Sequence, residues 1–127
     1  MIRSNVGRQV LLISIALVFG AIAIRTLLSP EPIAAELGYT LVAPNGYSEL
    51  FAVYVGVWLA TASLCVLAAV RVRQPLFGDL LAMFELAQPL GRLLALPQFG
   101  LPQGPLLAFF VVEVAGGLAL LAVRPSA

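Results

Sequence analysis

The sequence contains no histidine, no lysine and a single cysteine, and only 10% of its residues are charged. Without histidine, the chain has no imidazole to bind a metal or to carry a proton. Cys65 alone cannot form an internal disulfide or a cysteine-based metal site. The sequence also lacks a glycine-rich dinucleotide fingerprint, so we expect no metal and no cofactor. A net charge of +1 argues against the capture of a nucleic acid.

Apolar residues make up 61% of the 127 residues, whereas a soluble domain is roughly half apolar and roughly 25% charged. Four apolar stretches stand out, at about 9–28, 50–70, 76–96 and 105–123. Each approaches the ~20 residues that a helix needs to cross ~30 Å of hydrocarbon. Lipid offers no water to a non-helical backbone, so each crossing should be helical. The sequence therefore predicts an all-α fold, an integral membrane four-helix transmembrane bundle, in which residues 1–127 form one domain in a lipid bilayer.

The placement of arginine predicts the orientation of this bundle. Arg3 and Arg8 precede the first stretch, Arg71 and Arg73 lie between the second and third, and Arg124 follows the fourth. The two loops on the other side contain no arginine. Basic residues concentrate on the cytoplasmic side of membrane proteins. We therefore expect a multi-pass plasma-membrane protein with both termini in the cytoplasm. We interpret the first stretch as a retained crossing, because no clear signal-peptide cleavage site follows it.

Charged side chains inside the apolar stretches give the main functional signal. A charge at the bilayer centre costs at least ~2.5–3.5 kcal/mol on insertion scales, so it usually faces the bundle interior or a wet cavity. Glu85 and Glu113 fall near the middle of their stretches, while Arg25, Glu49 and Arg92 fall toward the outer surface. We expect these side chains to share one cavity that opens to the outer side. Such a mixture would give its carboxyl groups different acid strengths, which suits acid–base chemistry without histidine.

Helical spacing places Glu85, Gln88 and Arg92 on one stripe of the third crossing. Pro89 lies within this stretch and has no N–H to donate, so it should kink the helix. These positions predict that the stripe lines an interior space shared with Glu113.

On the second crossing, Trp58 lies one turn beyond Tyr54, and both aromatic rings suit the apolar part of a pocket. Glu49 points roughly 140° away from Tyr54 around an ideal helix. A wide cavity, or a break in the helix near residues 45–48, is needed to bring them together.

Three functions fit these residues. The first is an intramembrane enzyme that acts on a lipophilic small molecule by proton transfer, in isomerisation, epoxide opening or cyclisation. Its Glu residues would donate and accept protons, and Arg92 would hold an anion or tune the acid. The second is a small proton-coupled transporter subunit, which would work as a homodimer. The third is an accessory or structural membrane protein whose buried charges form ion pairs.

The segment NGYSELFAVYVG, which begins at Asn45, resembles the DUF4345 family of small four-helix membrane proteins within the broader DoxX-like group. The resemblance covers about residues 45–122. The matching residues are Asn45, Glu49, Tyr54, Gly56, Gly91, Arg92 and Glu113. Phe51 stands where family members often carry a basic residue, so Glu49 lacks that partner within its own helix. The resemblance implies a four-helix bundle and a set of candidate residues, but no particular activity.

These observations together define the candidate site. The candidate catalytic residues are Glu49, Glu85, Arg92 and Glu113. The candidate substrate-binding residues are Asn45, Tyr54, Trp58 and Gln88.

Overall fold

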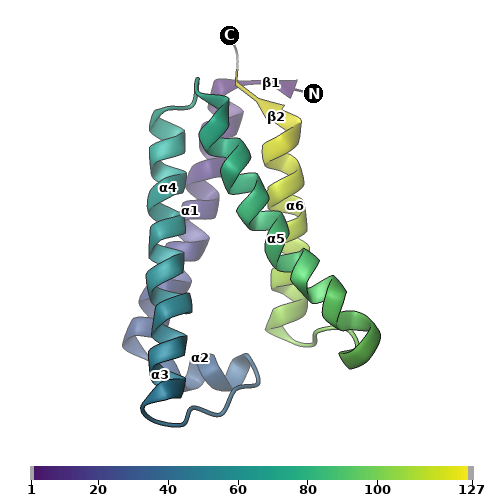
Figure 1. The fold of residues 1–127 in the computed structure, drawn as a ribbon. Coiled ribbons are helices and arrows are strands. Elements are labelled where there is room, and N and C mark those ends of the chain that lie inside the picture. Colours follow the sequence, from purple (N-terminus) through teal and green to yellow (C-terminus); the bar gives the residue numbers. More distant parts are fainter. Residues whose placement is uncertain (1, 126–127) are drawn as a thin grey trace.

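Four long helical segments cross the molecule in the computed structural model, which describes residues 2–125 (Figure 1). The first is α1 (Asn5–Leu28), and the last two are α5 (Pro75–Phe99) and α6 (Pro105–Ala122). The second crossing has three parts, as described below. All four segments are long and apolar enough to span a bilayer. The predicted all-α bundle of four membrane-spanning helices is therefore confirmed.

The second crossing is an unbroken helical rod with a change of winding in its middle. It consists of α3 (Asn45–Leu50), a π-helical segment (Phe51–Val57) and α4 (Trp58–Val70). The helix has no break at residues 45–48, where the Ser48 N–H donates to the Pro44 carbonyl at 3.1 Å. This crossing therefore begins about five residues earlier than hydropathy alone predicts.

The other helix ends also follow local signals. Ser4 caps α1 by accepting a 2.9 Å hydrogen bond from the Gly7 N–H, so α1 begins before residue 9. Helix α5 continues through both Pro89 and Pro97. It ends at Phe99, and the next residue, Gly100, has a φ of 81°, which glycine adopts at little cost.

Loops join the crossings at two opposite ends of the bundle. We call the end that carries residues 2–4, 71–74 and 123–125 the terminal end, since both chain termini lie there (Figure 1). The loop end carries residues 29–44 and 100–104. The α4–α5 turn lies at the terminal end, and α4 and α5 diverge from it toward the loop end (Figure 1).

The crossings pack as two pairs, α1 along α4 and α5 along α6. Gly117 permits the close approach of the second pair, because a Cβ there would lie 2.5 Å from Leu86 Cγ. Small residues serve this purpose in membrane helices. The main core joins both pairs and consists of Leu12, Ala16, Cys65, Ala68, Ala69, Leu81, Ala82 and Leu120.

At the terminal end, two short strands join the chain ends. Strand β1 (Ile2–Arg3) pairs in parallel with β2 (Val123–Arg124). The predicted all-α fold contains no strand, and hydropathy extends the fourth crossing to about residue 123. Helix α6 instead ends at Ala122, because the next residues enter this pairing.

At the loop end, the short helix α2 (Pro30–Glu36) packs over the start of the second crossing. Arg25 pairs there with Glu36, with Nη1 2.9 Å from Oε2, and both side chains are exposed. Hydrogen bonding to Arg25 holds the pKa of the Glu36 carboxyl below its usual value. Arg25 is therefore not part of an interior cavity, and the prediction that it shares one with the buried glutamates is wrong.

Candidate functional site

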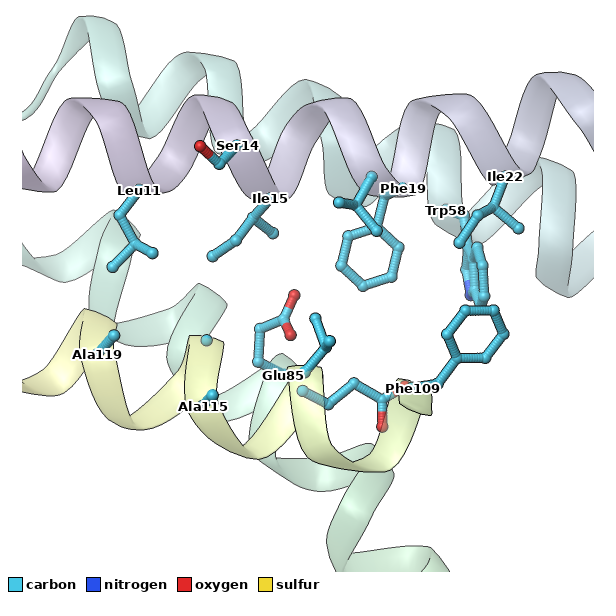
Figure 2. A pocket seen from close by; sticks show the side chains of 14 residues that line it. Leu11, Ser14, Ile15, Phe19, Ile22, Trp58, Glu85, Phe109, Ala115 and Ala119 are labelled. Carbon is cyan, nitrogen blue, oxygen red and sulfur yellow. The ribbon is translucent and has the colours of Figure 1, made fainter. Parts of the chain in front are cut away.

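A cavity of about 380 Å³ lies between α1 and α6, and side chains of α4 and α5 complete its walls. The walls are apolar except for Ser14, Glu85 and Glu113. Figure 2 shows Leu11 and Ala119 toward one end and Trp58 and Phe109 at the other. We call this space the α1–α6 cavity. Its size and apolar walls are typical of sites for small lipophilic molecules.

Glu85 extends from α5 into this cavity, and its carboxyl group lies between α1 and α6 (Figure 2). The residue is 4% exposed. Its Oε1 is buried and has no hydrogen-bond partner among the described residues. The other oxygen faces Gly116, where a Cβ would lie 3.6 Å from Oε2. An unpaired polar atom in an apolar cavity is rare in a folded protein and calls for a functional explanation.

Glu113 reaches the same cavity from α6 and is 6% exposed, but its carboxylate is paired. Arg92 of α5 forms an ion pair with its Oε2. Glu113 is therefore the ion-pair partner of Arg92. The cavity holds two carboxyl groups in different states, one beside a cation and one with no partner.

An aromatic cluster closes the end of the α1–α6 cavity nearer the loop end. Trp58 is 6% exposed, and its ring meets Phe19 edge-on at 5.2 Å between centroids. Phe109 approaches the same ring at 6.4 Å, and Tyr54 at 4.7 Å. Trp58 therefore lies in the cavity wall, whereas Tyr54 contacts its ring but is not among the lining residues.

Glu49 and Tyr54 line a different space, a groove of about 460 Å³ at the loop end. Glu49 is exposed there. The expectation of one cavity that contains Glu49 together with Glu85 and Glu113 is thus wrong. The π-helical segment (Phe51–Val57) follows Glu49, and its i→i+5 bonding puts more residues in each turn, which brings Glu49 and Tyr54 onto one face toward this groove.

Two further candidates lie outside the α1–α6 cavity. Asn45 is exposed at the start of α3. Gln88 is half-buried on α5 and is not among the residues that line the cavity. The predicted stripe of Glu85, Gln88 and Arg92 therefore contributes one side chain directly, and Arg92 contributes through its pairing with Glu113.

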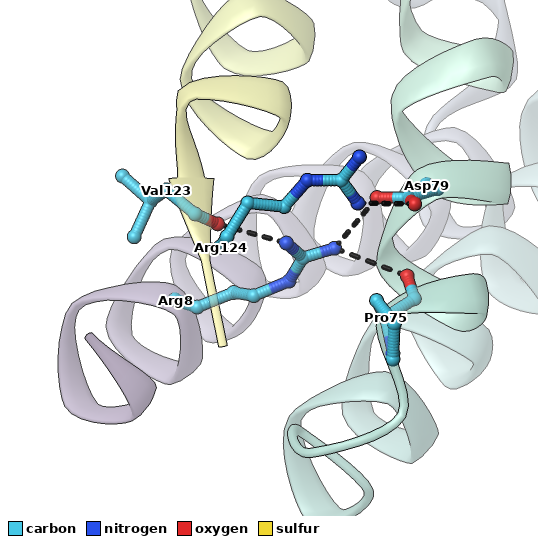
Figure 3. Close-up of polar contacts among 5 residues, drawn as sticks. All are labelled: Arg8, Pro75, Asp79, Val123 and Arg124. Carbon is cyan, nitrogen blue, oxygen red and sulfur yellow. Dashed lines mark hydrogen bonds and ion pairs between the residues drawn. The ribbon is translucent and has the colours of Figure 1, made fainter. Parts of the chain in front are cut away.

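Sequence reasoning missed a second charged cluster, at the terminal end (Figure 3). Arg8 is 1% exposed and donates to the Val123 carbonyl at 2.8 Å and to the Pro75 carbonyl at 3.2 Å. It also pairs with Asp79 Oδ1 at 3.0 Å, and Arg124 pairs with the other oxygen. We call Arg8, Asp79 and Arg124 the terminal clasp.

The terminal clasp was missed because its arginines also fit the pattern of a cytoplasmic end. Asp79 is the one acid at that end of the sequence, and this imbalance was the available signal. Gly78 supplies the space, since a Cβ there would lie 2.2 Å from Arg8 Nη2. The clasp thereby ties α1, α5 and β2 together next to the cavity.

No group of three or more His, Cys, Asp or Glu residues within residues 2–125 could hold a metal ion. Comparison with known proteins shows a match to a family model. No curated protein and no solved structure matches the chain. The model of one family, described as a domain of unknown function (DUF4345), matches residues 7–123, which is most of the chain. The chain therefore belongs to the DUF4345 family, and it is a small multi-span membrane protein.

Proposed function

We propose that this protein binds a lipophilic small molecule in the α1–α6 cavity and exchanges a proton with it through Glu85. The observation that carries the proposal is the buried Glu85 Oε1, which has no hydrogen-bond partner in the part of the chain that the structure describes. Leaving a buried polar atom unsatisfied costs ~1–3 kcal/mol. A ligand hydroxyl or carbonyl at this position would supply the missing hydrogen bond. The apolar walls would bind the remainder of the ligand.

The two carboxyl groups suit different roles in a proton transfer. An isolated charge is costly in apolar surroundings, so the neutral acid is the form that the site of Glu85 accommodates. A neutral carboxylic acid can donate its proton to a ligand oxygen or alkene. Glu113 carries the charge that pairs with Arg92, so it can accept a proton or stabilise a developing cation. Isomerisation, epoxide opening and cyclisation all use such a donor, and isomerisation also needs an acceptor.

Replacing Glu85 with leucine should remove the bound compound without unfolding the protein. Leucine fills a similar volume with no unpaired polar atom, so the unfolding temperature should stay equal or rise. The measurement is mass spectrometry of compounds extracted from the purified protein, together with thermal unfolding in the same detergent. Glu49→Gln is the control, because it changes an acid in the separate loop-end groove.

The proposal predicts one enriched lipophilic compound in the wild type and in Glu49→Gln, and its loss in Glu85→Leu. Glu85→Gln should keep part of the binding but abolish turnover of the identified compound, because an amide cannot give up its proton as an acid does. No enriched compound in the wild type, or equal retention by Glu85→Leu, would contradict the proposal.

One observation favours a structural role instead. Arg8 and Glu113, the other charged side chains that are nearly fully buried, both have ion-pair partners. A protein that uses its charges only to hold helices together would show this arrangement. It would not need the unpaired Glu85, and its Glu85→Leu variant would differ from the wild type only in stability.

We further propose that the terminal end faces the cytoplasm, on the basis of charge. It carries five of the seven arginines, namely Arg3, Arg8, Arg71, Arg73 and Arg124. A reporter fused after Ala127 should then show cytoplasmic activity. A signal from the opposite side of the membrane would reverse the assignment.

A further inference from the structure

A second, polar pocket of about 480 Å³ lies at the terminal end, separate from the α1–α6 cavity. The first turns of α1 supply Asn5 and Gln9 to its wall. The end of α4 and the α4–α5 turn supply residues 70–74. Gln9 is fixed in place, because its Nε2 donates to the Ala69 carbonyl at 3.0 Å. We call this space the turn pocket.

The turn pocket holds two positive charges that no acid of the described chain neutralises. Arg71 and Arg73 line it, and neither forms an ion pair within residues 2–125. The nearby arginines Arg8 and Arg124 are instead held on Asp79. The Arg71 guanidinium lies over the Phe77 ring, 5.8 Å from its centroid. Two arginines and three amide side chains around one space form a set of donors that suits an anion with several oxygens.

The depth of the turn pocket points to the source of that anion. The turn at residues 71–74 joins two membrane-spanning helices directly, so it lies at the level of the lipid headgroups. Val70, the last residue of α4, forms part of the pocket wall and is 77% exposed. A ligand here therefore meets donors at one side and a bare apolar side chain at the other. This combination matches a phosphate attached to acyl chains.

We propose that the turn pocket binds the headgroup phosphate of an anionic phospholipid, with Arg71 and Arg73 as its main ligands. Basic pockets on the cytoplasmic side of membrane proteins are suited to anionic headgroups, whose charge attracts each nearby arginine. The binding energy comes from neutralising two charges that residues 2–125 leave without an ion pair. This site is independent of Glu85 and of the proposed proton transfer.

Native mass spectrometry of the full chain in detergent tests this proposal. The probe is phosphatidylglycerol, and phosphatidylcholine with the same acyl chains is the zwitterionic comparison. Arg73→Gln should weaken phosphatidylglycerol binding about fivefold, the effect of one basic residue near an anionic lipid surface. Arg71→Gln combined with Arg73→Gln should weaken it further. Arg3→Gln is the matched control, since Arg3 is exposed at the same end but does not line the turn pocket.

The expected pattern is tighter binding of phosphatidylglycerol than of phosphatidylcholine, lost in the double variant and kept in Arg3→Gln. An equal loss of phosphatidylglycerol binding in Arg3→Gln would show that the lipid is attracted to positive charge in general, and this result would overturn the proposed site. Displacement of the lipid by inorganic phosphate would assign the pocket to a soluble anion and overturn the lipid. Circular dichroism of each variant establishes that the helices are intact, and Arg73→Gln alone decides the outcome if the double variant fails to fold.

Discussion

Replacing Asp79 with alanine should destabilise the protein by ~3–5 kcal/mol, the cost of leaving a buried charge without its partner. The charge at risk is Arg8, which is 1% exposed and cannot reach water without moving α1. Its contacts with the carbonyls of Pro75 and Val123 satisfy two donors but do not neutralise it. The measurement is thermal or denaturant unfolding of the purified variant in detergent.

Two control variants separate this effect from a general change of charge. Arg124→Ala removes the other partner of Asp79, yet Arg8 keeps its 3.0 Å ion pair, so the loss should be smaller. Arg3→Ala removes an exposed arginine that forms no ion pair within the described chain, so stability should barely change. Equal losses for Asp79→Ala and Arg3→Ala would show that the terminal clasp contributes nothing specific.

The terminal clasp also bears on the proposed function through geometry. It links α1 with α5 and β2, and β2 continues directly from α6. The cavity lies between α1 and α6, which the terminal clasp thus connects. Helix pairs in lipid lack a hydrophobic force between them, so a buried ion pair at one end can fix their separation. Asp79→Ala should therefore release a bound compound even though Asp79 does not line the cavity.

Hydropathy was sufficient to predict the four crossings, because a bilayer allows few other solutions for long apolar segments. It could not place their ends, which depend on local contacts such as the Ser4 cap on α1 and the φ of 81° at Gly100. It also could not show whether Pro89 ends a helix. Helix α5 continues past this residue, which costs one backbone hydrogen bond to the Glu85 carbonyl.

The presence of Glu85 and Glu113 in one cavity could also be predicted from the sequence, but the choice of ion-pair partners could not. Glu85 and Glu113 both line the cavity, as their positions near mid-membrane predict. Glu49 does not, because it is exposed at the loop end and lines a separate groove with Tyr54. The π-helical winding that puts these two residues on one face had no signal in the composition of FAVYVGV.

The ion pair between Arg92 and Glu113 should show a large loss on one substitution and recovery on the second. Arg92→Ala leaves the Glu113 carboxylate, whose side chain is 8% exposed, without its partner. We expect a loss of ~3–5 kcal/mol. Glu113→Gln should cost less, because the Arg92 side chain is 22% exposed and can turn toward water or headgroups. Unfolding of both single variants in detergent measures the difference.

The double variant Arg92→Ala with Glu113→Gln decides what the pair contributes. Removing both charges leaves no buried ion, so most of the stability lost in Arg92→Ala should return. The compound should stay bound at Glu85 in the double variant, because neither substitution touches that carboxyl. Turnover should stay absent if Glu113 accepts the proton, since glutamine cannot do so. A double variant as unstable as Arg92→Ala would show that Arg92 acts through other contacts, and restored turnover would remove Glu113 from the proposed mechanism.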